Sequence, residues 1–330
     1  MRTMEETVHR GSDQPQSTGS LGPALVVLGP TAVGKSSLAM RLARHLDGEI
    51  VNADALQVYR GLDLGTDKPT PEMRQEIPHH LVDSLDPTET YSAGDFARRA
   101  RAALLDITAR RRLPIIVGGS GLYLKALLEG LGPLPRRDEK IRARLEARIH
   151  EHSIESLHEE LSEIDPVTAT RVEPRDRQRI VRALEVHALS GRPMSSLLAE
   201  KSPDFVPVDA VLIGLTLPRS ILYDRIAERI RDMVDRGWVE EVSALLDRGI
   251  GPTAPAFQAI GYSQVVHYIL GRTSLDQAIE TTVKATRRYA KRQMTWFRRV
   301  EGIRWIPALE IEHQFSILLR EFTLGGALAR

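Results

Sequence analysis

The fold is decided by the segment ALVVLGPTAVGKS, which runs from Ala24 to Ser36. Its first five residues form a short apolar run, which predicts a buried strand, and apolar residues recur at helical spacing from Ser36 to Leu46. Between strand and helix, the loop matches the pattern GxxxxGK(S/T), in the structural context that this motif requires. The loop residues predicted to hold a phosphate group are Gly29, Pro30, Thr31, Ala32, Val33, Gly34, Lys35 and Ser36.

Each part of this loop has a predicted task. Backbone N–H groups and the helix N-terminus would surround a diphosphate, and Lys35 would neutralise its oxygens. The Ser36 hydroxyl would bind Mg²⁺, the one metal ion that the sequence predicts. An ordinary glycine turn before a helix is the alternative, and the agreement of the motif with its flanking elements favours the phosphate site.

Further strands are predicted at Glu49–Ala53, Leu113–Val117 and Ala210–Leu217, with helical segments between them. This alternation predicts an α/β fold, a doubly wound parallel sheet containing the phosphate loop, with its ligand site beyond the carboxyl ends of the strands. Strand signals disappear in the middle of the chain. The predicted organisation is a disordered extension (1–20), a core in two parts (21–135 and 206–330), the second with basic and packing helices at its end, and a helical insertion (136–205).

The composition is that of a globular protein, with a formal net charge of +1 that does not by itself indicate a polyanionic partner. There are no cysteines, so disulfides, thiolate metal sites and cysteine nucleophiles are excluded, and a reducing cytoplasm is compatible. No apolar run is long enough for a membrane-spanning helix, and the first twenty residues lack the apolar centre of a signal peptide. His79 and His80 have no partner pair at metal-ligand spacing, so no structural metal is predicted.

Asp54 directly follows a predicted strand and is the main candidate for acid–base chemistry. It could act as a general base, bind a metal ion or cap the next helix. Nucleotide hydrolases commonly place a magnesium-binding Asp at the end of a strand, but the strand Leu113–Val117 ends in glycine. Asp83 is the other comparable carboxylate, and the residues alone leave the reaction open.

Basic residues gather near the C-terminus, where Thr281 to Val300 contains no acidic residue. Four of them, which we call the basic stripe, are three or four residues apart and would share one helix face: Lys284, Arg287, Arg288 and Lys291. Arg292, Arg298 and Arg299 follow, beside Trp296 and Phe297. Together they suit the backbone and unpaired bases of RNA, and a solvated basic helix is an equal alternative. A second cluster, in the insertion, is equally compatible with a salt-bridged surface: Arg171, Arg175, Arg177, Arg179 and Arg182.

These motifs, taken in order, resemble the tRNA dimethylallyltransferases over nearly the whole chain after Ser20. The matching segments after the phosphate loop are Asp54–Tyr59, Gly65–Pro69, His79–Asp83, Gly118–Tyr123, Gln178–Arg182, Gln258–Tyr262 and Lys291–Arg298. The resemblance implies that the loop holds the diphosphate of dimethylallyl diphosphate. The dimethylallyl group would pass to the exocyclic amine (N6) of the adenosine on the 3′ side of the anticodon, with Mg²⁺ as cofactor.

The resemblance also implies roles for individual residues. Asp54 would be the base, Thr31 a polar contact at the reacting centre, and Arg225 the arginine on the leaving diphosphate. Residues implied to touch tRNA are Asp54, Ala55, Leu56, Gln57, Ser120, Arg142, Gln178, Arg179, Ile180, Val181, Arg182, Gln258, Ala259, Ile260, Gly261, Tyr262, Ser263, Lys291, Arg292, Gln293, Met294, Thr295, Trp296, Phe297 and Arg298. A cytoplasmic monomer is expected, with no membrane partner.

The chain departs from the family pattern at two positions: Ala55 stands where Ser is common, and Ser120 where Thr is usual. The first puts one hydrogen bond to the base or RNA in doubt, and the second loses only a methyl group. A P-loop kinase of a small molecule or nucleotide is the alternative function. An RNA-binding NTPase switch is a third possibility.

Overall fold

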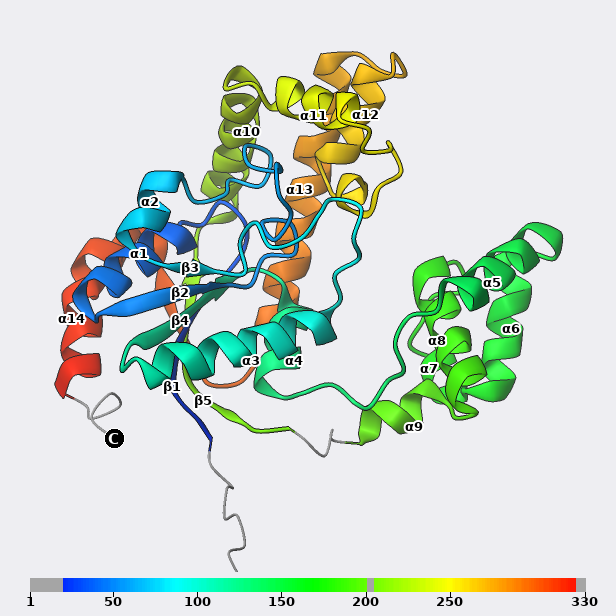
Figure 1. Cartoon of the computed structure of the whole chain (residues 1–330), viewed down its shortest axis with the longest axis horizontal. Helices are drawn as coiled ribbons and strands as arrows, with labels where there is room; N and C mark the ends of the chain where they lie inside the picture. The colour runs from blue at the N-terminus through cyan, green and yellow to red at the C-terminus, as the bar shows by residue number, and fades with distance from the viewer. Residues whose placement is uncertain (1–19, 201–204, 325–330) are drawn as a thin grey trace, which may run out of the picture.

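The computed structural model describes residues 20–200 and 205–324. At its centre is a six-stranded sheet, with the strands in the order β3-β2-β4-β1-β5-β6 and every neighbouring pair parallel (Figure 1). The strands are β1 (Leu21–Leu28), β2 (Gly48–Asn52), β3 (His79–His80), β4 (Leu113–Gly118), β5 (Val208–Thr216) and β6 (Ile303–Pro307). The predicted parallel sheet is confirmed.

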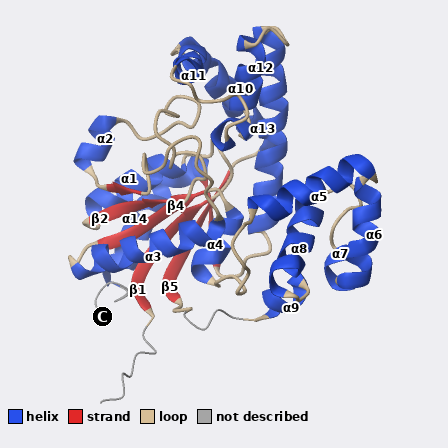
Figure 2. Ribbon diagram, turned by 45° about the vertical axis from the view of Figure 1, so that its right-hand side comes forward, coloured by secondary structure: helices blue, strands red, loops and turns tan. Residues whose placement is uncertain are grey.

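Helices cover both faces of the sheet (Figure 2). Alternate side chains of β1 point to opposite sides: Val27 packs in one cluster with residues of α1 and α14, and Val26 in another with residues of α3 and α4. The core helices are α1 (Lys35–His45), α2 (Pro71–Glu76), α3 (Ala93–Ala109), α4 (Gly121–Leu128), α10 (Arg219–Asp235), α11 (Trp238–Asp247), η1 (Pro255–Gln258), α12 (Tyr262–Ile269), α13 (Leu275–Phe297), η2 (Ala308–Glu310) and α14 (Ile311–Leu324). This is the doubly wound arrangement that the sequence predicts.

The segment between β4 and β5 also contains a group of helices that lies to one side of the sheet in both ribbon views. They are α5 (Glu139–Glu151), α6 (Ile154–Ile164), α7 (Pro166–Ala169), α8 (Arg177–Ser190) and α9 (Met194–Ala199). Their apolar faces meet in a separate core that includes Leu145, Leu161 and Leu184. We call α5 to α9 the helical insertion.

Two strands were not predicted from the sequence. Strand β3 is only two residues long, too short for a periodic pattern, and β6 is an edge strand that pairs with β5 alone. The predicted N-terminal extension lies, except for Ser20, outside the described residues. Across 20–200 and 205–324, no helix is both long and apolar enough to cross a membrane.

Candidate diphosphate and acceptor site

The phosphate loop connects β1 to α1 at the sheet edge where β2 and β4 also end. Helix α1 begins after Gly34, whose φ of 103° is left-handed, and no side chain caps its first N–H groups. At Gly29, where φ is 146°, an added Cβ would lie 2.8 Å from the carbonyl oxygen of Leu215. Glycine is therefore required at this position, and the free N–H groups at the start of α1 are available to an anion.

Lys35 lies in this loop, and its Nζ donates a hydrogen bond to the carbonyl oxygen of Pro30, 2.8 Å away. Burial and the nearby positive charge of Arg229 lower the pKa of Lys35 to about 8, against the opposing attraction of Asp54 and Asp67. Asp54, Asp67 and Arg229 thus lie near enough to Lys35 for their charges to act on its ammonium group. A bound diphosphate would favour the protonated form of Lys35.

Gln293 of α13 fixes the backbone of the loop. Its Oε1 accepts a hydrogen bond from the backbone N–H of Thr31 at 2.9 Å, and its Nε2 donates one to the carbonyl oxygen of Gly119 at 2.9 Å. The side chain is buried. The resemblance implied that Gln293 touches tRNA, whereas the structure places it between the loops that follow β1 and β4. It sets the distance between these loops.

Replacement of Gln293 by Leu is therefore expected to weaken the binding of inorganic diphosphate by up to about 30-fold, because two buried hydrogen bonds of about 1 kcal/mol each orient the loop. Isothermal titration calorimetry with diphosphate measures this effect. Binding of tRNA to the same variant is the control. A variant that loses tRNA affinity and keeps diphosphate affinity would contradict the loop-fixing role and support direct RNA contact.

The arginine nearest the loop is Arg229, not Arg225. Arg229 Nη1 lies 3.5 Å from the Thr31 hydroxyl and 3.5 Å from a carboxylate oxygen of Asp67. Arg225, one helical turn earlier on α10, is exposed and has no hydrogen bond or ion pair within the described residues. Residues four apart lie on the same helix face, so helical spacing alone cannot choose between them. The structure thus places Arg229 at 3.5 Å from the Thr31 hydroxyl, whereas the sequence analysis named Arg225 and not Arg229.

Asp54 lies just beyond β2, half-buried, in a turn that fixes its carboxylate. Its Oδ1 accepts a hydrogen bond from the backbone N–H of Leu56 at 2.8 Å, and its own N–H donates to Oδ1 of the buried Asn52 at 3.3 Å. Oδ2 has no hydrogen-bond partner among the described residues. One oxygen of Asp54 is thereby oriented by the protein, while the other is available to a substrate.

Tyr289 of α13 also belongs to this region, although no motif pointed to it. Burial raises the pKa of Tyr289 to about 12, and the negative charge of Asp54 contributes to the rise, while the side chains of Ser120 and Gln293 act against it. Its phenol is neutral at physiological pH. In the sequence, Tyr289 lies among the basic residues of the predicted helix, and no pattern there indicates that its side chain points toward the core.

Several residues implied to contact tRNA are inaccessible. Ile180 and Val181 are buried in the core of the helical insertion, and Phe297 and Tyr262 are buried in the core around the sheet. The Tyr262 hydroxyl donates instead to Glu241 at 2.7 Å. These four side chains support the fold. A contiguous motif includes both helix faces, so its inward members cannot bind RNA.

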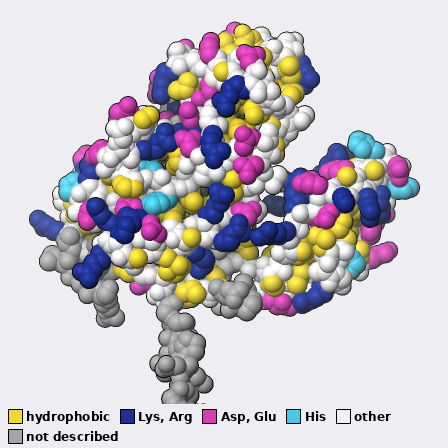
Figure 3. Space-filling view, viewed as in Figure 1, with side chains coloured by type: hydrophobic (Ala, Val, Ile, Leu, Met, Phe, Trp, Pro, Cys, Tyr) yellow, Lys and Arg dark blue, Asp and Glu magenta, His cyan; other side chains and the backbone are white. Residues whose placement is uncertain are grey.

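Other members of the implied tRNA set are accessible. Exposed side chains are those of Gln178, Arg179, Gln258, Lys291, Arg292, Thr295, Trp296 and Arg298, and partly exposed ones are those of Ala55, Leu56, Gln57, Ser120, Arg142, Arg182, Ala259, Ile260, Ser263 and Met294. Gly261 is buried, and an added Cβ there would lie 2.3 Å from the ring of Trp238. Figure 3 shows Lys and Arg side chains between the core and the helical insertion, interspersed with acidic ones.

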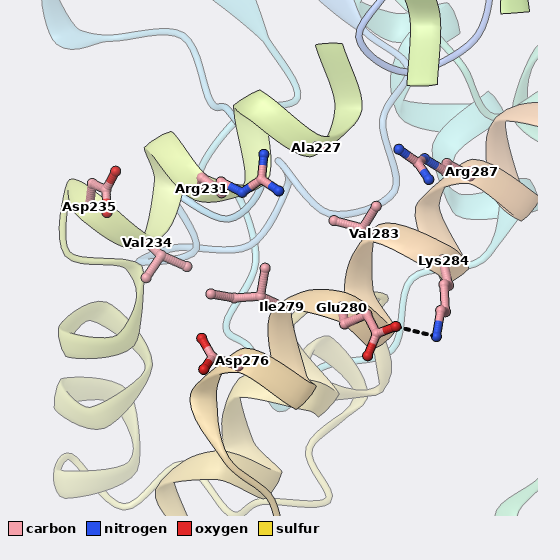
Figure 4. Close-up of a pocket in the computed structure, with 10 residues that line it drawn as sticks. All are labelled: Ala227, Arg231, Val234, Asp235, Asp276, Ile279, Glu280, Val283, Lys284 and Arg287. Carbon is pink, nitrogen blue, oxygen red and sulfur yellow. Dashed lines mark ion pairs between the residues drawn. The ribbon is translucent and has the colours of Figure 1, made fainter. Parts of the chain in front are cut away.

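The basic stripe is not a row of four free cations. Lys284 pairs with Glu280 at 2.5 Å, an acid just outside the acid-free segment (Figure 4). Arg287 lines the pocket between α10 and α13, lies over the ring of Tyr223 at 5.1 Å and donates to its carbonyl oxygen at 3.2 Å. Arg288 and Lys291 are exposed, without ion-pair partners in the described part of the chain. Half of the stripe is thus available to an anionic ligand.

In the insertion, the second basic cluster forms surface ion pairs. Arg175 pairs with Glu155, Arg177 with Glu146, and Arg179 with Asp176. Such exposed pairs add little to stability. For these three arginines, the salt-bridged surface that the sequence allowed is the arrangement found.

The sheet, the phosphate loop and the helices on both faces define a P-loop protein of the α/β class. Residues 57–300 match the family model described as IPP transferase. A tRNA dimethylallyltransferase of Geobacter sulfurreducens is 46% identical over 288 residues, which cover 87% of this chain and 93% of that protein. One of Thermomicrobium roseum is 47% identical over 285 residues, covering 86% and 85%. The chain belongs to the IPP transferase family.

Solved structures agree with this assignment. The tRNA isopentenylpyrophosphate transferase of Bacillus halodurans has a TM-score of 0.68 and 38% identity, with 93% of this chain and 97% of that chain covered. A eukaryotic dimethylallyltransferase, described as acting on tRNA, has a TM-score of 0.73 and 27% identity, with 89% and 75% covered. The predicted P-loop fold is therefore confirmed.

Proposed function

We propose that this enzyme transfers the dimethylallyl group of dimethylallyl diphosphate to N6 of the adenosine on the 3′ side of the tRNA anticodon and releases diphosphate. The observation that supports this proposal most is that an anion-binding loop and a candidate base lie together at the carboxyl ends of β1 and β2. The loop after β1 offers N–H groups and Lys35 to a diphosphate, and the turn after β2 offers Asp54, close enough to influence the pKa of Lys35. A base and an anion site thus lie together.

The reaction joins N6 to C1 of the dimethylallyl group as the bond between C1 and the diphosphate oxygen breaks. Electrons of that bond leave with diphosphate, where Lys35, Arg229 and the loop N–H groups stabilise the growing negative charge. Asp54 takes the proton that N6 loses on forming the new bond. The Thr31 hydroxyl, which lies 3.5 Å from Arg229 Nη1, would be a polar contact at the reacting centre, as the resemblance implies.

Mg²⁺ is part of this proposal. Among the described residues no group of three or more His, Cys, Asp or Glu side chains is placed to hold a metal ion. The exposed hydroxyl of Ser36 at the start of α1 fits an ion whose other ligands are diphosphate oxygens and water, as is usual for Mg²⁺. When bound there, the ion would neutralise charge on the departing diphosphate.

Incubation of the protein with labelled dimethylallyl diphosphate, Mg²⁺ and unmodified tRNA tests the proposal. Label should enter the RNA at the adenosine next to the anticodon, and diphosphate should be released in equal amount. ATP turnover on a small acceptor without labelled RNA would support the kinase, which the family match disfavours. Slow nucleotide hydrolysis without covalent change in RNA would support the NTPase switch.

We further propose a monomeric enzyme of the cytoplasm. The absence of cysteine fits a reducing compartment. Its partners would be dimethylallyl diphosphate and the anticodon stem-loop of tRNA, with the exposed part of the basic stripe against the RNA backbone.

The basic stripe leads to a prediction about salt dependence. Replacement of Arg288 and Lys291 by Ala should reduce the slope of log affinity for tRNA against log salt by roughly 0.7 to 0.9 for each phosphate group that the variant no longer binds. Lys284→Ala is the matched control and should change the slope less, because Glu280 already pairs with Lys284. Filter binding between 50 and about 200 mM salt measures the slope. An unchanged slope in the double variant would mean that the stripe is only a solvated surface.

A further inference from the structure

Glu185 of α8 is a fully buried carboxylate in the helical insertion. Its Oε1 accepts a hydrogen bond from the backbone N–H of Asp138 at 2.8 Å. Its Oε2 accepts from Nη1 of Arg182 at 2.8 Å and from Nη1 of Arg142 at 3.2 Å. A buried carboxylate is unfavourable unless such partners compensate for the loss of water, and here the two arginines and the N–H of Asp138 supply this compensation.

These contacts join three parts of the insertion. Arg182 also donates from Nη2 to the carbonyl oxygen of Pro135 at 2.7 Å, and Asp138 caps α5 through the N–H groups of Lys140 and Ile141. The segment that leads from the core into α5 is thereby tied to α8. Helix α8 lies on the side of the insertion that faces the core in both ribbon views.

Arg142 and Arg182 are held differently from the other arginines of the insertion. Their side chains are 16% and 28% exposed, and both bond the same buried oxygen. Arg175, by comparison, is 86% exposed and pairs with a surface acid. Two guanidinium groups share one carboxylate, so the trio keeps a net charge of +1 and has N–H groups left for an anion. A rigid pair of this kind suits phosphate, because the forked donors are ordered before binding.

We propose that Glu185 is a positioning residue that fixes Arg142 and Arg182 as a preformed pair for the phosphate backbone of tRNA. This inference rests on the proposed function, since it takes the acceptor to be tRNA. Glu185 itself contacts no RNA. It acts through the direction of the two guanidinium groups and through their connection to the segment entering α5.

Replacement of Glu185 by Gln distinguishes a role in orienting Arg142 and Arg182 from a simple effect of its negative charge. The change removes a negative charge beside two arginines, so if these act only as point charges, tRNA binding should tighten and its salt slope should steepen. Positioning predicts the opposite: KM and Kd for tRNA rise about tenfold, whereas kcat at saturating tRNA and KM for dimethylallyl diphosphate stay near the wild-type values. Initial rates and filter binding measure both.

Glu160→Gln is the matched control. Glu160 pairs with Arg148 at 2.6 Å in the same insertion and is partly exposed, so the control makes the same charge change without freeing Arg142 or Arg182. Its tRNA affinity should equal or exceed that of the wild type. In a background of Arg142→Gln and Arg182→Gln, the effect of Glu185→Gln should largely disappear, because the groups through which Glu185 acts are gone.

Thermal unfolding and limited proteolysis show whether each variant keeps the insertion folded. If the insertion of Glu185→Gln does not fold, the Glu185→Asp variant is tested in its place. Its side chain keeps the negative charge but is shorter by one methylene group, so tRNA affinity should still fall. The positioning role would be overturned if a folded Glu185→Gln or Glu185→Asp variant bound tRNA as tightly as the wild type or more tightly. It would also be overturned if Glu185→Gln lowered tRNA affinity equally in the background that lacks Arg142 and Arg182. Failure of the wild-type enzyme to modify tRNA would instead refute the proposed function.

Discussion

Replacement of Asp54 by Asn is expected to slow dimethylallyl transfer by about 100-fold or more while leaving tRNA affinity nearly intact, because the base is lost and the shape is kept. Asn can still accept the hydrogen bond that the N–H of Leu56 donates to Oδ1 of Asp54. The turn after β2 should therefore survive. Single-turnover measurements with enzyme in excess over tRNA isolate the chemical step from product release.

Asp106→Asn is a matched control for this variant. Asp106 is exposed near the end of α3, which leads into the start of β4 and thus lies at the sheet edge opposite the phosphate loop. The Asp106→Asn substitution makes the same chemical change at a position far from the phosphate loop and Asp54. A near wild-type single-turnover rate in Asp54→Asn would remove Asp54 from the role of base.

Arg229→Gln is expected to lower kcat/KM for dimethylallyl diphosphate by about 100-fold, which corresponds to about 2.7 kcal/mol of lost stabilisation of the departing diphosphate. Its position 3.5 Å from the Thr31 hydroxyl is the basis for this expectation. Affinity for tRNA should stay near the wild-type value. Steady-state kinetics with varied donor and saturating tRNA measure the effect.

Arg225→Gln tests the same helix one turn away. Arg225 is exposed, and no described residue bonds to it, so its replacement should leave kcat/KM for the donor within about threefold of the wild type. The pair distinguishes the two arginines directly. A large loss in Arg225→Gln with little change in Arg229→Gln would restore the position that the family resemblance implied.

Contiguous motifs were the part of the site that sequence could predict well. The loop from Gly29 to Ser36 is built from neighbouring residues, so the pattern and its flanking strand and helix specify its place in the fold without long-range information. The same holds for the parallel sheet, since alternating strands and helices leave few ways to bury both faces. Asp54 was singled out as a candidate because it directly follows a strand.

Only the tertiary structure decided which side chains of each helical motif face the site. Arg225 and Arg229 are equivalent by spacing, and the packing of α10 against the core places Arg229 beside the loop. Gln293 and Tyr289 point inward from a helix whose composition indicated an RNA-binding surface.

Charge followed the same division. The sequence determined how many cations α13 carries and, through i,i+4 spacing on that helix, the ion pair of Lys284 with Glu280, whereas the packing of α10 places the ring of Tyr223 against Arg287. The sequence of this protein thus determined its fold class, its phosphate loop and the place of Asp54 directly after β2. The fold alone decided the arginine beside the loop and the contact of Arg287 with Tyr223, because these contacts join residues that lie far apart in the sequence.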